Sequence, residues 1–116
     1  MSELSQKVCS ACSGDEDTLK ATEIYDHMKD LDDQWEEEDN HHIERKFEFE
    51  DFQEALDFVN EVGEIAEEQG HHPVINDFTW GKAKVKLYTH KIDGLHENDF
   101  IMAAKIDELY RDSYGE

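Results

Sequence analysis

The chain has 116 residues, a length typical of one domain that can bury a core with a thin margin of stability. Its 31 acidic and 11 basic residues give a net charge of −20, which disfavours nucleic acid and anionic membranes as partners. No run of about 18 apolar residues occurs, and the N-terminus lacks the apolar stretch of a signal peptide. We therefore expect a cytoplasmic protein with no membrane contact.

Residues 1–17 are predicted to form a flexible leader, followed by one domain over residues 18–116. The leader contains Cys9 and Cys12 in a single CxxC pattern. A zinc site needs four ligands, or three and a water molecule, and no second CxxC follows. The pair is therefore interpreted first as functionally silent. A metal clip completed by a partner chain and a redox-labile pair are the alternatives.

The next predicted elements are a helix and a strand. Apolar residues on one helical face predict an amphipathic helix over residues 18–31. Trp35 stands alone among acidic residues and is interpreted as an apolar anchor or a site residue, with a short strand expected near it. Alternation in "HHIERKFEFED" predicts a half-buried strand beginning near His41. The doublet His41-His42 is interpreted as solvated strand residues.

A second helix is predicted after Asp51, which with Glu54 resembles a capping box. Apolar residues then recur at helical spacing, and Gly70 is suited to end the helix in a left-handed conformation. Pro73, the only proline, biases the preceding residue toward an extended conformation. The doublet His71-His72 is therefore expected in the connection between this helix and the following strand.

The last elements are predicted to be a hairpin and a helix. Residues 74–80 and the alternating residues 82–90 indicate two strands joined at Gly81, and a helix is predicted over residues 97–110. Together these elements predict an α+β fold: a four-stranded antiparallel sheet with three helices packed on one face.

Three histidines, His71, His72 and His90, stand at the ends of predicted elements and could line one pocket mouth. Imidazole titrates near neutrality, so paired rings can supply an acid and a base. Surface decoration and zinc binding are the competing interpretations. Because neighbouring side chains in an extended segment point to opposite sides, acid/base work is favoured over a metal site, and no metal is expected.

The spacing of several residues resembles the signature of the pterin-4a-carbinolamine dehydratases. In this signature Glu67-x3-His71-His72-Pro73 is followed by six residues to Trp80, nine to His90 and eight to Asp99. The stretches "FEFEDFQEALDFVNEVGEIAEEQGHHP" and "THKIDGLHENDFIMAAKID" are also similar to the family, and the resemblance covers about residues 18–112. The sequence departs from the usual pattern at His96, where serine or threonine is the more common helix cap.

The resemblance implies a hydro-lyase that removes water from a 4a-hydroxytetrahydropterin to give the quinonoid dihydropterin, which recycles the pterin cofactor of aromatic amino-acid hydroxylation. It implies no metal or organic cofactor of the enzyme itself. Its catalytic group would be His71, His72 and His90, with His71 and His90 as the acid/base pair and His72 mainly binding substrate. The residues expected to bind the pterin are Gly70, His71, His72, Tyr88, Thr89, His90, Lys91, Trp35, Glu67 and Asp99.

The family also contains proteins that act as dimerisation partners of a transcription factor. A non-catalytic binding module of the same fold is therefore the alternative function, although a pure binding module need not keep the histidine set. The resemblance and the exposed edge of the predicted sheet favour a homodimer or homotetramer.

The acidic excess is spread along most of the chain rather than confined to one tail. Ordinary solubility is one interpretation. The favoured interpretation is adaptation to high internal salt, because at about 1 M salt the Debye length is only about 3 Å and crowded carboxylates repel one another weakly.

Overall fold

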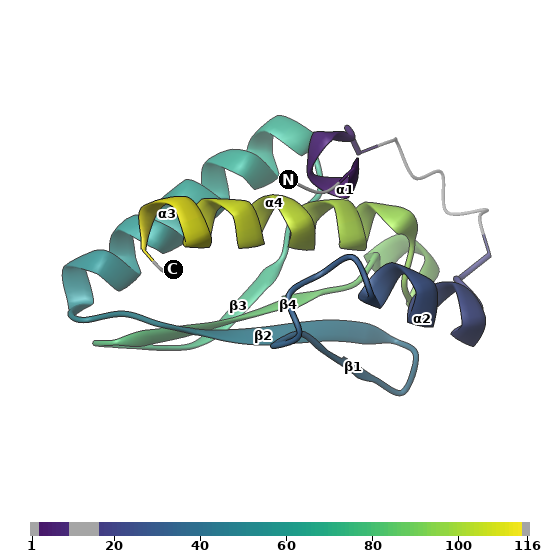
Figure 1. Ribbon diagram of the computed structural model, residues 1–116, viewed down its shortest axis with the longest axis horizontal. Helices are drawn as coiled ribbons and strands as arrows, with labels where there is room; N and C mark the ends of the chain where they lie inside the picture. The colour runs from purple at the N-terminus through teal and green to yellow at the C-terminus, as the bar shows by residue number, and fades with distance from the viewer. Residues whose placement is uncertain (1–2, 10–16, 115–116) are drawn as a thin grey trace.

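The computed structural model describes residues 3–9 and 17–114, which form an α+β fold (Figure 1). Four antiparallel strands lie in the order β1-β2-β4-β3, and the helices cover one face of the sheet, as predicted. The elements are α1 (Glu3–Gln6), α2 (Ala21–Met28), β1 (Glu36–Glu38), β2 (His42–Glu48), α3 (Phe52–Gln69), β3 (Val74–Thr79), β4 (Lys82–Leu87), the 3-10 turn η1 (His90–Ile92) and α4 (Glu97–Ser113).

Helix α3 begins and ends where the sequence predicts. The Asp51 side chain accepts a hydrogen bond from the Glu54 amide at 2.9 Å, which satisfies one of the free amides of the first turn. Gly70 ends the helix with a φ of 68°, a conformation that costs glycine little. The chain therefore leaves α3 at a fixed angle, and His71 and His72 follow directly.

The hairpin between β1 and β2 is closed by a two-residue turn. Asp39 and Asn40 both have a φ of 55°, and the His41 amide donates to the Glu38 carbonyl at 2.8 Å. Two consecutive residues with positive φ are typical of the type I′ turn, whose twist matches that of the strands. His41 is thus the first residue after the turn.

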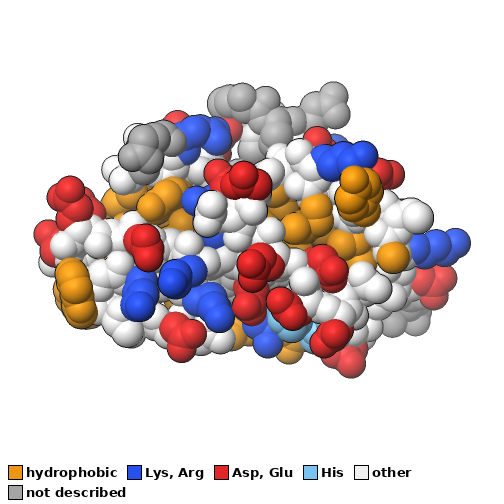
Figure 2. Space-filling model, turned by 60° about the horizontal axis from the view of Figure 1, so that its bottom comes forward, with side chains coloured by type: hydrophobic (Ala, Val, Ile, Leu, Met, Phe, Trp, Pro, Cys, Tyr) orange, Lys and Arg blue, Asp and Glu red, His pale blue; other side chains and the backbone are white. Residues whose placement is uncertain are grey.

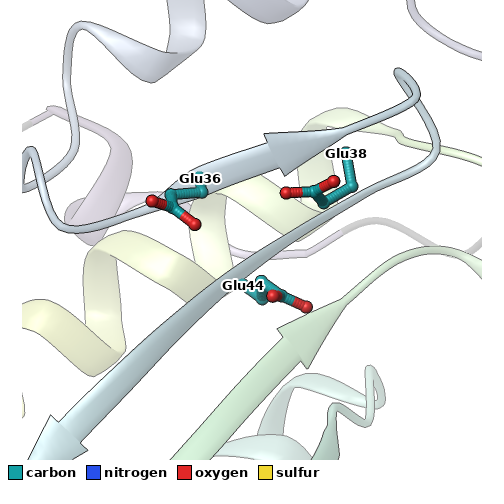
Figure 3. A group of neighbouring side chains, drawn as sticks. All are labelled: Glu36, Glu38 and Glu44. Atoms are coloured by element: carbon teal, nitrogen blue, oxygen red, sulfur yellow. The ribbon is translucent and has the colours of Figure 1, made fainter.

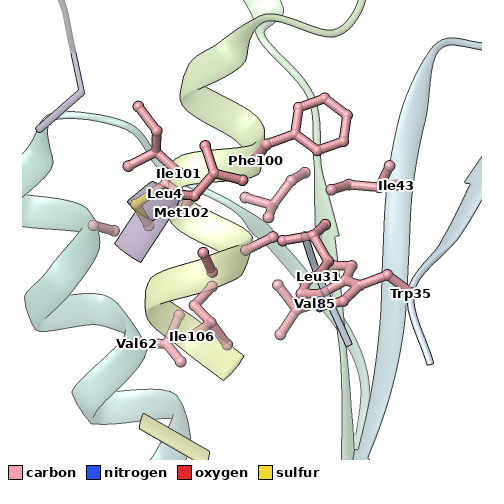
Figure 4. Packing of buried hydrophobic residues seen from close by; sticks show 14 of the residues in the cluster. Leu4, Leu31, Trp35, Ile43, Val62, Val85, Phe100, Ile101, Met102 and Ile106 are labelled. Carbon is pink, nitrogen blue, oxygen red and sulfur yellow. The ribbon is translucent and has the colours of Figure 1, made fainter. Parts of the chain in front are cut away.

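The core lies between the sheet and the helices (Figure 4). Ile43 and Phe47 of β2 and Val85 of β4 point toward the helices, as the alternation predicts, and Phe100 and Ile106 of α4 meet them. Burial of side chains of this size is worth about 1.5–3 kcal/mol each. Helix α4 is buried on several sides because it packs against α1, α2, α3 and β4.

The structure differs from the sequence prediction at the N-terminal end. Residues 3–9 belong to the expected flexible leader, yet α1 packs against α4 and Leu4 is only 3% exposed. Polar contacts with α4 accompany the burial of Leu4: Lys105 Nζ donates to the Ser5 carbonyl at 2.9 Å, and Lys7 pairs with Glu97 at 2.8 Å. The first predicted helix is also shorter than expected, because it spans only Ala21–Met28. At its start the Glu23 side chain accepts a hydrogen bond from the Lys20 amide, and at its end the chain turns.

The opposite face of the sheet is not covered by helices and is strongly polar (Figure 2). Lysines alternate along β4, while glutamates gather toward β1. A groove on this face is lined by side chains of both signs, among them Glu36, Glu44, Lys46 and Lys84. Within the part of the chain that the structure describes, no helix is both long enough and apolar enough to cross a membrane.

Candidate active site

Asp99, in the first turn of α4, joins the histidine doublet to the end of β4. Its side chain is fully buried and accepts three hydrogen bonds: from His71 Nε2 at 2.6 Å, from Thr89 Oγ1 at 2.9 Å and from the His96 amide at 2.9 Å. A buried carboxylate needs such donors to offset the loss of water. One side chain therefore brings together three segments that the sequence marked separately.

The start of α4 also explains the histidine at position 96. His96 Nδ1 accepts a hydrogen bond from the Asn98 amide at 3.1 Å, so imidazole takes the role that serine or threonine usually has. Asp99 completes the capping box by accepting from the His96 amide. Asp99 consequently serves the helix and the site together.

The contact with Asp99 fixes the tautomer of His71. A carboxylate can only accept a hydrogen bond, so the shared proton belongs to Nε2 of His71. The neutral ring then presents Nδ1 as its proton acceptor. The His71 side chain is 11% exposed, which limits the orientations that the ring can adopt. This arrangement suits a general base.

His72 points to a different partner, as expected for neighbouring residues in an extended segment. Its Nε2 lies 2.6 Å from Oε2 of Glu67, and both side chains are largely exposed. The two residues line a shallow groove between α3 and β3, together with Pro73 and Ile75. Because the pair is exposed, it contributes little to folding stability and remains available to a ligand.

His90 lies on a short loop that is closed by backbone hydrogen bonds. The Thr89 amide donates to the Gly94 carbonyl at 2.8 Å, and the Gly94 amide returns a bond at 3.3 Å. A side chain at position 94 would place its Cβ 2.4 Å from Cγ2 of Thr18, so the Thr18 side chain would have to move to admit it. The exposed His90 ring lies 4.3 Å from the Tyr88 ring, and Lys91 is exposed on the same loop.

Most of the sequence-predicted site residues therefore lie on connected segments. His71, Thr89 and Asp99 are joined by hydrogen bonds, Gly70 adjoins His71, and Tyr88, His90 and Lys91 adjoin Thr89. His72 and Glu67 form a separate pair on the α3 side.

The structure does not bring Trp35 together with the other residues that were expected to bind the pterin. Its side chain is only 3% exposed, and its indole N–H donates to Oδ1 of Asp107 at 2.7 Å. The indole also packs edge-on against Phe47 in the core. Trp35 is the apolar anchor of the two interpretations given above.

His41 and Asp93 lie near the site but were not identified from the sequence as site residues. His41, assigned to solvent, lies 2.7 Å from Asp93 Oδ1 and packs 4.6 Å from the Tyr88 ring. The doublet His41-His42 was visible in the sequence, but the turn that aims it at Tyr88 is known only from the backbone conformation of Asp39 and Asn40.

The other candidate ligands of the chain lie apart from this network. Burial raises the pKa of the Cys9 thiol to about 11, which makes it a poor nucleophile, and Cys12 lies outside the described residues. Among the described residues, the group close enough to share a metal ion consists of Glu36, Glu38 and Glu44, on β1 and β2 (Figure 3). Glu36 and Glu38 are exposed and Glu44 is half-buried, and none of the three is a predicted site residue.

Comparisons with known proteins identify the family to which the chain belongs. The family model for pterin 4 alpha carbinolamine dehydratase matches residues 17–109. A protein of Rubrobacter xylanophilus, provisionally named a pterin-4-alpha-carbinolamine dehydratase, is 53% identical over 109 residues, which cover 94% of this chain and 100% of the relative. A relative in Alkaliphilus metalliredigens with the same provisional name is 44% identical, covering 93% of this chain and 96% of its own length.

A solved structure shares the fold. The crystal structure of a transcriptional coactivator/pterin dehydratase from Brucella melitensis superposes with a TM-score of 0.74 at 31% identity. The match covers 80% of this chain and 98% of the other. The chain therefore belongs to the pterin 4 alpha carbinolamine dehydratase family of hydro-lyases.

Proposed function

We propose that the protein dehydrates a 4a-hydroxytetrahydropterin to the quinonoid dihydropterin. A base removes the proton from N5, the C4a–O bond breaks, and the departing hydroxyl takes a proton and leaves as water. The electron pair of the N5–H bond becomes the second bond between N5 and C4a. In this scheme the step recycles the pterin cofactor used in aromatic hydroxylation.

In this proposal His71 and His90 are the acid/base pair and His72 binds the substrate. The observation that carries it is the bond from His71 Nε2 to the buried Asp99, because it leaves Nδ1 of the neutral ring as a proton acceptor. Thr89 binds the second oxygen of Asp99, so the same carboxylate fixes the residue next to His90. Tyr88, Lys91, Gly70 and Glu67 would complete the pterin site.

A dehydration assay tests the proposal. Synthetic 4a-hydroxytetrahydropterin is mixed with the protein, and the ultraviolet change on dehydration is followed against the spontaneous rate. We expect a clear acceleration that persists after treatment with EDTA, because both proton transfers use imidazole. Loss of the rate with EDTA and its return with zinc would contradict the acid/base roles. No acceleration at all would leave a non-catalytic binding module as the function.

The assembly and location of the protein are part of the same proposal. Strand β3 is an edge of the sheet, and unpaired strand edges favour association. The exposed rings of Phe78 and Trp80 lie on or beside this strand. We expect a homodimer or homotetramer in the cytoplasm, which sedimentation analysis and cell fractionation would check.

A further inference from the structure

A second set of contacts reaches the loop of His90 from the β1–β2 hairpin. His41 Nε2 lies 2.7 Å from Oδ1 of Asp93, its ring lies 4.6 Å from the Tyr88 ring, and the Tyr88 ring lies 4.3 Å from that of His90. We propose that His41 is a positioning residue, which holds His90 through Tyr88 and Asp93. The catalytic part of this inference rests on the role proposed for His90.

The backbone places His41 against this loop. In the register of the sheet Ile43 lies opposite Leu87, so the next residues, His42 and Tyr88, meet where β4 ends. The turn at Asp39 and Asn40 reverses the chain immediately before. His41 therefore stands at the end of the sheet from which Tyr88 and His90 emerge.

Asp93 is held in an unfavourable backbone conformation by its surroundings. Its φ is 51°, in the left-handed region, where residues other than glycine are uncommon. Its amide donates to the His90 carbonyl at 3.2 Å, which closes η1 around His90. Such conformations persist where neighbouring contacts enforce them. The hydrogen bond from the Asp93 amide keeps this turn closed, and the bond from His41 then reaches the Asp93 side chain beside it.

The neighbouring His42 helps to orient the His41 ring. Nδ1 of His41 lies 3.1 Å from Nδ1 of His42, so one proton is shared between the two rings. Burial, with the nearby charge of Lys86 as a second cause, lowers the pKa of His42 and keeps that ring neutral near pH 7. His41 thus has a partner at each ring nitrogen: His42 at Nδ1 and Asp93 at Nε2.

These contacts are suited to ordering a loop rather than to stabilising the fold. The His41 side chain is 34% exposed and that of Asp93 is 86% exposed, and ion pairs in such settings contribute little stability. A small displacement of a catalytic ring such as that of His90, in contrast, lowers the rate of proton transfer strongly. A positioning role therefore predicts a loss of kcat with little loss of stability.

The experiment compares His41→Ala with His41→Phe and the control His27→Ala. His27, on helix α2, also contacts an aromatic ring, that of Phe100 at 5.0 Å, but it has no described contact with the loop of His90. We expect His41→Ala to lower kcat about tenfold with little change in KM, and the Tm to stay within about 2 °C of the wild type. His41→Phe, which keeps a ring against Tyr88, should recover part of the rate. His27→Ala should keep the wild-type kcat.

A second readout does not depend on activity. The NMR chemical shifts of the His90 ring protons should include a ring-current shift from Tyr88. The change in these chemical shifts in the variant Tyr88→Leu gives the size of that ring-current shift. We expect this shift to shrink in His41→Ala and to stay in His27→Ala. An unchanged shift and an unchanged kcat in a folded His41→Ala would overturn the inference. If the wild type shows no dehydratase activity, the proposed function fails, and the shift alone still decides whether His41 orders His90.

Discussion

Helix α4 carries two buried aspartates, and each gathers three donors from distant segments. Asp99 binds His71, Thr89 and the His96 amide. Asp107 binds the Trp35 indole at 2.7 Å, Arg45 Nη1 at 2.7 Å and the Asp32 amide at 3.1 Å. The two sites are alike in burial and in the number of hydrogen bonds, but they differ in the chemistry of the donors.

The donors of Asp107 keep their protons at neutral pH, because neither an indole nor a guanidinium titrates there. Burial raises the pKa of the Asp107 carboxyl, while the bonds from Trp35, the Asp32 amide and Arg45 oppose that change. Asp99 instead holds an imidazole, the side chain that exchanges protons near pH 7. A buried carboxylate therefore fixes structure in one place and prepares a proton acceptor in the other.

The largest effect is expected for the histidines that Asp99 serves. His71→Ala and His90→Ala should each lower the dehydration rate by a factor of roughly 10²–10⁴, which is the usual contribution of a positioned acid or base. Both variants should keep the far-ultraviolet circular dichroism of the wild type. A loss from His41→Ala as large as that from His71→Ala would show that the wrong doublet has been assigned to the chemistry.

At the structural site, Asp107→Ala should lower the free energy of unfolding by about 3–5 kcal/mol, because the buried Arg45 loses its hydrogen-bonded partner and keeps only the partly exposed Asp32, at 3.6 Å. This is a large part of the 5–15 kcal/mol that is typical of a domain. Urea unfolding measures the change. The exposed Asp112→Ala is the matched control, and the double variant Asp107→Leu with Arg45→Met should recover much of the loss. If Asp107→Ala were as stable as Asp112→Ala, the structural role assigned to Asp107 would be contradicted.

Asp99→Asn keeps the size of the side chain but allows its amide to donate to His71. The ring would then carry its proton on Nδ1 and lose the proposed acceptor, so we expect the rate to fall by roughly 10²-fold or more. Loss of the capping box should cost only about 1 kcal/mol of stability. Rate assays and urea unfolding, with the exposed Glu68→Gln as control, separate the two effects. A variant that unfolds readily but keeps full specific activity when folded would assign Asp99 to structure alone.

Substitution of the exposed carboxylates should give the smallest effects. Unlike Asp99 and Asp107, which accept three hydrogen bonds each, these side chains face solvent and repel one another. Glu36 lies directly opposite Glu44 in the β1–β2 pair, and like charges in such pairs destabilise a sheet by up to about 1 kcal/mol. We expect the Tm to rise steadily from about 0.1 M to about 2 M potassium chloride. Glu36→Lys and Glu64→Lys should each raise the Tm at low salt and change it little at high salt. A Tm independent of salt would reject salt adaptation.

Much of the fold could be predicted because its signals are local. The cap at Asp51, the end at Gly70 and the alternation in β2 each depend on neighbouring residues only. Helix α3 shows the limit of periodicity. The apolar residues Phe52, Leu56 and Val59 recur at helical spacing and predict a buried face, yet Phe52 is 50% exposed and stacks on Phe78, whereas Phe58, which lies off that spacing, is fully buried. Two adjacent apolar stripes occur on this helix, and only tertiary packing decides which one meets the sheet.

The site was predictable where the spacing of a family signature fixed it. His71 and Asp99, two anchors of that signature, are joined by a hydrogen bond. His41 and Asp93, which form one pair, are separated by 52 positions in the sequence. Arg45 and Asp107, which form another, are separated by 62 positions. Neither pair leaves a local pattern, because a contact between distant residues depends on the register of the sheet and the position of the helices.

The packing of α1 on α4 has a consequence for how the chain is made. Leu4, in the first element of the described fold, is buried with the help of α4, which is synthesised after every other described element. Until α4 has left the ribosome, the part of the sheet that α4 covers and the side of α3 that meets α4 remain exposed. The nascent chain therefore cannot complete its core while it is being synthesised, and its many carboxylates would help to keep the waiting segments in solution.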